Sequence, residues 1–417
     1  MARKMKDSGI EWIGEIPEGW EVATIGHLFS VTAGGDAKPH LYSYVQDAKH
    51  PYPVYTNSSN PNQIYAYTSA PKFNENTITV TGRGDIGHAF YRNTKFDAII
   101  RLLVLAPKSA LDCRYYAYWI DNVSIFFTNS AAVGQLSAQQ IFPYKTCYLP
   151  LCEQQSIANH LDFYCSEIEH ILADIQNSIQ EYKKLKQAVI TQAVTKGVRG
   201  EREMKDSGNP WFGQIPTDWK LSRVGLHFSI ILGKMLCNAP LNDTYTLEPY
   251  YCAADVHFDG VADGERKKMW FSPIEKDLYR VSVGDLLVVE GGAGAGGSAI
   301  VENQDSYTYI QNSIMIVRSK GNADNRYLRY LLEFLVKQGY IDVVCNKATI
   351  PHFTKDKLSC VPFCLCGEQE EIADYLDAKC AEIDKLIAKK EQLVKELENY
   401  KKSLIFEYVT GKKELRR

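Results

Sequence analysis

The chain has 417 residues, 45% of them hydrophobic and 23% charged, which is too long for one ordinary hydrophobic core and indicates two or more domains. The formal net charge of −3 and the pI near 6.3 exclude nucleic-acid binding by bulk positive charge, although Lys and Arg gathered on one face would still permit it. No apolar run follows the first basic residues and none is long enough to cross a bilayer, so we expect a cytoplasmic protein without membrane contact.

The opening segment of the chain recurs near its middle. Residues 5–9, Met-Lys-Asp-Ser-Gly, are repeated letter for letter at 204–208, an offset of 199 residues. Later matches keep the order of the chain while the offset grows to 215, as insertions in the loops of a second copy would produce. The matched pairs include Trp12 with Trp211, Trp20 with Trp219, Arg114-Tyr115 with Arg326-Tyr327, and Glu153-Gln154 with Glu368-Gln369. The chain is therefore a duplicated domain-plus-helix unit.

The first part of each copy, residues 1–150 and 200–365, is rich in Tyr, Thr, Val and Gly. Its short apolar runs, such as 98–105 and 309–317, are typical of strands between turns. Residues 117–120 and 330–334 are typical of short helices. We therefore predict the α+β class, with two homologous α/β domains.

The second part of each copy, residues 151–199 and 366–417, is predicted to be a long helix used as a spacer. Apolar residues step alternately by four and three along both segments, and no Pro or Gly interrupts the steps from 157 to 189 or from 372 to 404. About 40 residues at a rise of 1.5 Å give a rod of roughly 60 Å. The predicted seam consists chiefly of Ile157, Leu161, Ile168, Ile175, Tyr182 and Leu185, and of Ile372, Leu376, Ile383, Leu393, Leu397 and Leu404.

One apolar seam would not keep either helix folded alone in water, so we expect the two helices to pack on each other. The first leads from domain one to domain two, and the second begins at domain two, which favours antiparallel packing. An antiparallel coiled coil makes the chain pseudo-twofold and nearly cyclic. The alternative is that each helix separately contacts a partner.

Motifs that resemble catalytic signatures lack their context. Residues 82–87 and 292–297 both fit GxGxxG, but strand-like residues follow where a dinucleotide site needs a helix. We interpret both as turns. No phosphate-binding loop, HExxH motif or shared nucleophile–base set is present, so we predict no catalytic residue. The 11 cysteines form no CxxC pair, and even the group at 360, 364 and 366 is expected to be thiols rather than a metal site.

With its doubled opening segment, paired glycine turns and helix junctions, the sequence resembles the specificity (S) subunits of type I restriction-modification systems, the HsdS family, over nearly its whole length. The first junction, residues 149–158, has the family's Pro-rich lead-in followed by Glu-Gln and Ile-Ala; the second, 364–373, keeps Glu-Gln but lacks that Pro.

This resemblance implies that the globular parts are target recognition domains, each reading one half of a bipartite target in double-stranded DNA. The helices would set the gap between half-sites and dock two methyltransferase (M) subunits, with restriction (R) subunits joining them. S-adenosylmethionine, ATP and Mg would be bound by those partners, and this chain would hold no cofactor.

Base and phosphate contacts need Arg, Lys, His, Asn or Gln at the surface. Our candidates are Lys38, His40, Asn57, Asn60, Arg83, His88, Lys234, Arg266, Lys267, Lys268, Lys347 and His352. Alternative functions are a recognition subunit of a related methylation or phage-defence system without a nuclease, a coiled-coil scaffold that binds only proteins, and an enzyme with an unrecognised site.

Overall fold

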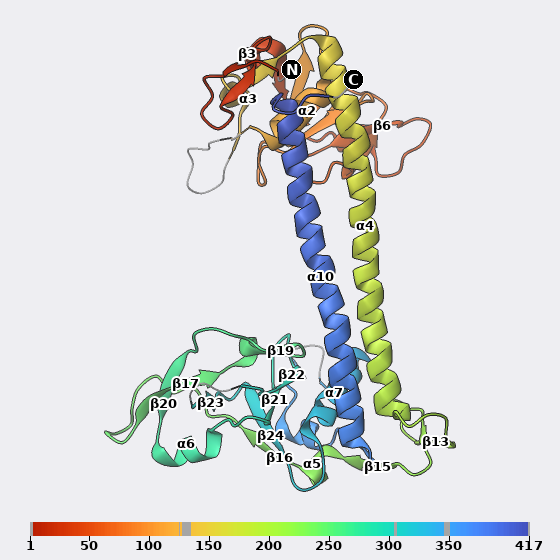
Figure 1. The fold of residues 1–417 in the computed structure, drawn as a ribbon, viewed down its shortest axis with the longest axis vertical. Coiled ribbons are helices and arrows are strands. Elements are labelled where there is room, and N and C mark those ends of the chain that lie inside the picture. The colour runs from red at the N-terminus through yellow and green to blue at the C-terminus, as the bar shows by residue number, and fades with distance from the viewer. Residues whose placement is uncertain (1–2, 125, 127–134, 304–306, 346–350, 416–417) are drawn as a thin grey trace. The chain divides into compact units, whose positions relative to one another are not determined.

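The computed structural model describes residues 3–124, 126, 135–303, 307–345 and 351–415 (Figure 1). It divides into two compact units, residues 1–176 with 391–417 (unit 1) and residues 177–390 (unit 2). Each unit therefore combines a globular part with one half of each of two long helices. The helices are α4, Leu151–Lys196, and α10, Gln369–Val409.

Unit 1 is built around a four-stranded antiparallel sheet in the order β4-β11-β8-β9. A second sheet, β10-β6-β7-β5, contains one parallel pair, β6 with β10, and β3 pairs with β12. The strands are β1 Met5–Asp7, β2 Glu15–Pro17, β3 Glu21–Thr24, β4 Phe29–Ala33, β5 Tyr42–Ser43, β6 Tyr52–Tyr55, β7 Ile64–Thr68, β8 Thr77–Val80, β9 Ala89–Arg92, β10 Asp97–Ala98, β11 Leu103–Pro107 and β12 Lys145–Tyr148. The short helices are α1 Ile25–Leu28, η1 Pro39–Leu41, α2 Cys113–Asn122 and α3 Ala138–Ile141.

The core of unit 1 lies between its main sheet, α2 and the long helices. All four residues of β8 are buried, as expected of a strand covered on both faces. Trp20, Trp119 and Tyr115 fill the space between the sheet and the start of α4, and Leu404 and Tyr408 of α10 belong to the same cluster. The globular part and the helix pair of unit 1 thus share one hydrophobic core.

Unit 2 repeats this plan. Its main sheet has the order β16-β24-β21-β22, β17 pairs in parallel with β23, and β15 pairs with β25. The strands are β13 Met204–Asp206, β14 Gln214–Pro216, β15 Lys220–Arg223, β16 Phe228–Leu232, β17 Thr246–Tyr251, β18 Val256–His257, β19 Gly260–Val261, β20 Lys268–Phe271, β21 Leu286–Val289, β22 Ser298–Ile300, β23 Tyr309–Ile310, β24 Ile314–Ser319 and β25 Pro362–Leu365. The short helices are α5 Val224–His227, η2 Ala253–Asp255, α6 Pro273–Tyr279, α7 Asn325–Lys337, α8 Tyr340–Val344 and α9 Lys355–Ser359.

The long helices run antiparallel within each unit. In unit 1, Lys401 Nζ lies 2.6 Å from Glu169 Oε1. The ring of Tyr408, further along α10, lies 4.3 Å from the ring of His160, which precedes Glu169. In unit 2, Lys186 Nζ lies 2.6 Å from Asp384 Oδ2, and the later Lys390 lies over the earlier Tyr182. The predicted α+β class, with two related domains joined by an antiparallel coiled coil, is confirmed.

One predicted strand run is interrupted in each copy. Residues 98–105 were expected to be continuous, but a turn separates β10 from β11, and a turn likewise separates β23 from β24. In each case the short strand joins the second sheet in parallel and the next strand joins the main sheet, so the backbone must change direction. Apolar composition alone does not reveal this crossing, because both strands are buried.

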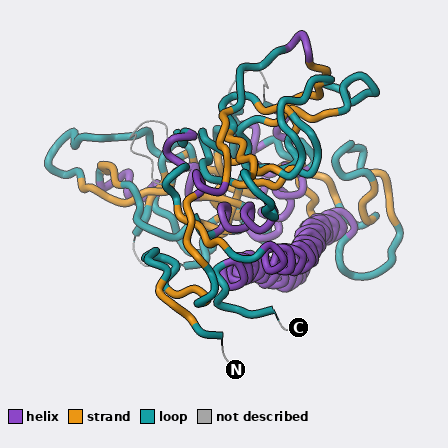
Figure 2. The backbone as a smooth tube through the Cα atoms, turned by 90° about the horizontal axis from the view of Figure 1, so that it is seen from above, coloured by secondary structure: helices purple, strands orange, loops and turns teal. Residues whose placement is uncertain are grey.

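The two ends of the described chain both lie in unit 1 (Figure 2). A pocket of about 570 Å³ is lined by Arg3 and Met5 near the start and by Gly411 and Lys412 after α10. This proximity agrees with the expected, nearly cyclic course of the chain. No helix among the described residues is both long and apolar enough to span a membrane.

Candidate functional site

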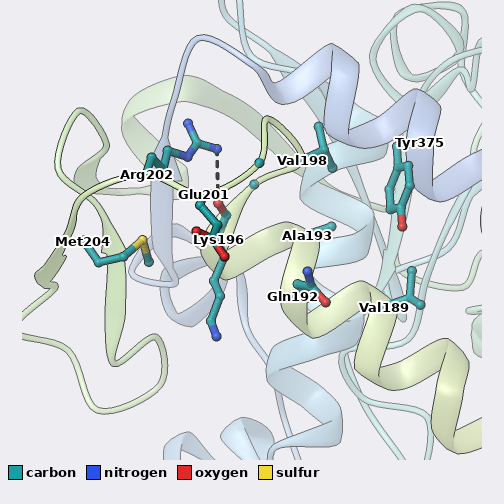
Figure 3. Close-up of a pocket in the computed structure, with 11 residues that line it drawn as sticks. Val189, Gln192, Ala193, Lys196, Val198, Glu201, Arg202, Met204 and Tyr375 are labelled. Atoms are coloured by element: carbon teal, nitrogen blue, oxygen red, sulfur yellow. Dashed lines mark hydrogen bonds between the residues drawn. The ribbon is translucent and has the colours of Figure 1, made fainter.

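A buried carboxylate at the start of α10 binds the opening segment of the second repeat. Glu368 accepts a hydrogen bond of 2.9 Å from the indole Nε1 of Trp219 and forms a 2.6 Å ion pair with Arg202. Arg202 also donates to the carbonyl oxygen of Lys196, the last residue of α4, at 3.1 Å beside a pocket of about 550 Å³ (Figure 3). This Trp–Glu–Arg cluster fixes the end of one long helix against the beginning of the other.

The same cluster occurs in unit 1. Glu153 accepts from Trp20 Nε1 at 3.0 Å and pairs with Arg3 at 2.6 Å. Gly411, two residues after the end of α10, has a φ of +71° and leaves no space for a Cβ against Pro17 and Trp20. The end of α10 therefore packs on the first opening segment.

A second cluster fastens the globular part of unit 1 to its long helix. Asp112 caps α2, and Arg114 bridges it to α4 through contacts of 2.6 Å to Asp112 Oδ2 and 2.8 Å to Asp162 Oδ2. Tyr118 donates to the other oxygen of Asp162 at 2.9 Å. The hydrogen bonds that Arg114 donates to Asp112 raise the pKa of Arg114, and burial beside Asp162 raises the pKa of Tyr118. The phenol thus remains a donor, and α2 is held at several points.

Unit 2 has the equivalent Asp–Arg–Asp bridge. Arg326 lies 3.2 Å from Asp324, the cap of α7, and 2.8 Å from Asp377 of α10. Tyr330 donates to Asp377 at 2.8 Å. Burial raises the pKa of Tyr330, and its bond to Asp377 adds to the shift.

The glutamine of each Glu-Gln pair completes the junction. The side-chain oxygen of Gln154 accepts from the backbone N–H of Asp112 at 2.9 Å, and that of Gln369 accepts from Asp324 at 3.0 Å. In each junction the Glu therefore binds the Trp of the opening segment, and the Gln accepts a hydrogen bond from the backbone at the start of α2 or α7. This explains in physical terms why the pair recurs in both copies.

The helix seam follows the predicted spacing with one shift. Ile157, Leu161, Ile168, Ile175, Ile372, Leu376, Ile383 and Leu404 are buried, and Tyr182 and Leu397 are half-buried. Leu185 and Leu393 are instead 48% and 43% exposed. Lys186 and Val394, each one residue further along, are partly covered instead. In a helix of 3.6 residues per turn, the third and the fourth residue after a seam residue lie on opposite sides of the seam, so only one of them faces the other helix.

The same shift leaves apolar side chains exposed on the long helices of both units. In unit 1 these are Tyr164, Ile171, Leu393 and Tyr400, which are 44%, 47%, 43% and 53% exposed. In unit 2 they are Leu185 and Leu386. Exposed apolar side chains that lie together are a frequent feature of protein interaction surfaces.

The expected DNA-contacting residues fall into two groups. Lys234 is 10% exposed, ion-paired with Glu275 and bonded to the carbonyl of Trp270, while Arg266 is paired with Asp255. Residues with exposed side chains are Lys38, His40, Asn60, Arg83, Lys267, Lys268 and His352. Lys347 lies outside the described residues.

Two further candidates serve the fold of unit 1. Asn57 uses its amide internally, accepting from the backbone N–H of Gly82 at 2.8 Å and donating to the carbonyl of Ile100. His88 lies between Asp85, at 3.0 Å, and Asp121, at 3.4 Å.

The two glycine motifs form hairpin turns, as interpreted from the sequence. Residues 82–87 connect β8 to β9, and residues 292–297 connect β21 to β22. No helix follows either motif, so neither has the backbone geometry of a dinucleotide site.

The functional residues that sequence reasoning missed are the junction side chains. Arg3, Arg114 and Glu153 belong to matched pairs in the repeat, yet a match alone does not reveal a contact. The useful signal was a charged residue kept in both copies, since such a residue needs the same partner twice. The cysteines at 364 and 366 are thiols whose pKa values burial raises to about 12.

Comparison with protein families matches residues 17–181 to a type I restriction modification DNA specificity domain. A putative type I restriction enzyme MjaX specificity subunit of Methanocaldococcus jannaschii is 26% identical, covering 96% of this chain and 95% of that protein. The C-terminal putative specificity subunit S.MpnORF289P of Mycoplasma pneumoniae is 30% identical over 26% of this chain and 78% of its own length. The chain spans 46% and 36% of two other Mycoplasma pneumoniae relatives, S.MpnORF89P and S.MpnORF507P, both 28% identical.

Two solved structures share the fold. A chain from a study of complex assembly and conformational transition of the type I R-M system superposes with a TM-score of 0.70, at 14% identity over 94% of this chain and 98% of that one. The HsdS subunit of Thermoanaerobacter tengcongensis superposes with a TM-score of 0.51, at 13% identity over 95% and 98%.

Proposed function

Because the chain belongs to the family of type I restriction-modification DNA specificity subunits, we propose that it reads a bipartite target in double-stranded DNA. Subunits of this family recognise DNA and are not catalytic. The globular parts, residues 1–150 and 200–365, are proposed as the two target recognition domains, with 151–199 and 366–417 as helical spacers. We also propose a cytoplasmic location, where a DNA target would be accessible.

The observation that carries this proposal is the duplication of the junctions. In both copies a Trp–Glu–Arg cluster and an Asp–Arg–Asp bridge hold a globular part on a long helix. A recognition domain held in this way cannot rotate freely on its helix. Two such domains approach the same side of a duplex only when the distance between their half-sites matches the helical repeat of DNA. Joining them also raises the effective concentration of the second reader once the first has bound.

We further propose that methyltransferase (M) subunits dock along the helix pair, with restriction (R) subunits joining the complex. The exposed apolar side chains of the long helices support this proposal: Tyr164, Ile171, Leu393 and Tyr400 in unit 1, and Leu185 and Leu386 in unit 2. S-adenosylmethionine, ATP and Mg are then bound by these partners.

The test is to map adenine methylation in the host with and without this gene. We expect deletion to abolish methylation at one bipartite motif with a fixed internal gap and complementation to restore it. An unchanged methylome, with the neighbouring methyltransferase expressed, would refute the proposal. Salt-dependent duplex binding by the purified complex would distinguish DNA recognition from a protein scaffold, since cation–phosphate contacts weaken with salt.

A further inference from the structure

The turn between β10 and β11 has an unusual backbone. Ile99 to Leu102 form a β-turn closed by a 3.2 Å hydrogen bond from the N–H of Leu102 to the carbonyl of Ile99. Its central residues, Ile100 and Arg101, have φ values of +53° and +57°. Such a turn normally carries Asn-Gly, and a β-branched residue with positive φ is a clear outlier.

The topology does not require this conformation. In unit 2 the same crossing, from β23 to β24, is made by Gln311, Asn312 and Ser313, with a 2.9 Å hydrogen bond from the N–H of Ile314 to the carbonyl of Gln311. None of these three residues has a positive φ. The strain of the first copy is therefore specific to its Ile-Arg pair, and strain kept in this way is typical of functional positions.

The surrounding backbone fixes the turn. The N–H of Ile100 donates to the carbonyl of Gly35 at 3.0 Å, and the amide of Asn57 donates to the carbonyl of Ile100. Asn57 also accepts from the N–H of Gly82, where a Cβ would lie 3.4 Å from the carbonyl oxygen of Arg101. The turn and the glycine hairpin that carries Arg83 therefore form one rim.

The arginines of residues 1–150 fall into two groups, those bound to other parts of the fold and those exposed without an ion pair among the described residues. Of the five, Arg3 pairs with Glu153, Arg114 bridges α2 to α4, and Arg92 is buried against Thr79 and Tyr55. Arg83 and Arg101 are exposed, and neither has an ion pair within the described part of the chain. Ile100, beside them, is 46% exposed. The rim thus presents two guanidinium groups and one aliphatic side chain on a fixed backbone.

We propose that the Ile100–Arg101 turn, assisted by Arg83, reads a guanine and an adjoining thymine in one half of the DNA target. A planar guanidinium forms two hydrogen bonds to O6 and N7 of guanine in the major groove, and an aliphatic group contacts the methyl of thymine. A rigid turn keeps this pairing selective, because the side chains need not be ordered on binding. This inference rests on the proposed function and names residues for one half-site.

The experiment compares the methylomes of hosts that carry single substitutions in this gene. We expect Arg101→Ala to remove the requirement for one guanine in one half of the motif, to lower methylation of cognate sites roughly tenfold to a hundredfold, and to leave the other half unchanged. Arg101→Lys should not restore the wild-type motif, because an ammonium group lacks the planar two-bond contact. Arg223→Ala, which removes an exposed arginine of unit 2, is the matched control and should change neither half.

A second variant separates recognition from folding. Asn tolerates positive φ, so Ile100→Asn should raise the melting temperature while lowering methylation. A raised melting temperature with an unaltered methylome would overturn the inference. So would a wild-type motif in Arg101→Lys, which would indicate a phosphate contact only. If gene deletion itself leaves the methylome unchanged, the proposed function fails rather than the assignment of this turn.

Discussion

The indole nitrogen of Trp219 lies 2.9 Å from a carboxylate oxygen of Glu368, at the point where α10 begins. Glu368 is 2% exposed, so water can replace neither the indole nor Arg202 as its partner. A buried carboxylate that loses a donor keeps the cost of its desolvation. This contact therefore contributes to the stability of unit 2 as well as to the junction.

We expect Trp219→Phe to lower the free energy of unfolding by about 1–3 kcal/mol, because the ring is largely kept while the donor is lost. Urea denaturation followed by circular dichroism would measure the change. Trp12→Phe is the matched control, since Trp12 is 40% exposed and donates to the carbonyl of Val123, a neutral acceptor. Equal losses in the two variants would contradict the importance of the buried carboxylate.

The Asp–Arg–Asp bridge of unit 2 should affect which spacing is read. Arg326 joins α7 to Asp377, and its replacement by Leu removes the charged links while Tyr330 still bonds to Asp377. We expect the complex that contains Arg326→Leu to methylate sites whose internal gap differs by one base pair, with unchanged base preferences in each half, because the tilt of the recognition domain on its helix is loosened. Methylome sequencing measures this directly. A strictly wild-type gap, at whatever methylation level, would contradict the prediction.

The exposed apolar residues of the long helices should be dispensable for folding and necessary for assembly. Ile171 is 47% exposed, so Ile171→Glu should leave the melting temperature nearly unchanged while preventing co-purification with the methyltransferase subunit. A charge placed in an interface core is costly because it loses water without gaining a partner. Ser166→Glu, on an exposed position of the same helix, is the control and should retain the partner. Normal assembly of the Ile171 variant would place the partner elsewhere.

Much of the architecture was predictable because the sequence contains an internal repeat, so its two halves can be compared with each other. The sequence contains two copies of the opening segment, of the Glu-Gln junction and of the apolar spacing of four and three residues. These repeats predict two units, each with a globular domain followed by a long helix. The apolar spacing predicts less exactly which residues are buried between the two helices. Leu185 was assigned to the seam because it is apolar, yet helix geometry turns it outward and covers part of Lys186.

The candidate site was predicted less well, because composition does not reveal which charges are paired. Lys234 and Arg266 are both cations in a polar segment, but each has an acidic neighbour brought close only by the fold, Glu275 and Asp255. Arg101 was overlooked because it lies within the run 98–105, which was interpreted as one strand. Its side chain is exposed because of the turn at Ile100 and Arg101, and the alternation of apolar and polar residues does not predict that turn.

Burial of Glu333 should make the stability of unit 2 depend on pH. This residue of α7 is 6% exposed, and desolvation raises the pKa of its carboxyl from the ordinary value of 4.5 although Arg329 lies 3.2 Å away. A raised pKa means that the folded state binds the proton more tightly than the unfolded state. The contribution of Glu333 to stability is therefore fully present below the unfolded pKa and is lost as the pH rises through the folded pKa.

Glu333→Gln removes this titration while keeping the shape of the side chain. We expect the variant to melt at a higher temperature than the wild type at pH 7, with the difference shrinking as the pH falls towards 4.5. Melting curves of both proteins across this range, at constant ionic strength, would measure it. A difference that grows towards acid pH would show that the ion pair with Arg329 outweighs burial, since a carboxylate stabilised by its partner loses that stabilisation when it is protonated.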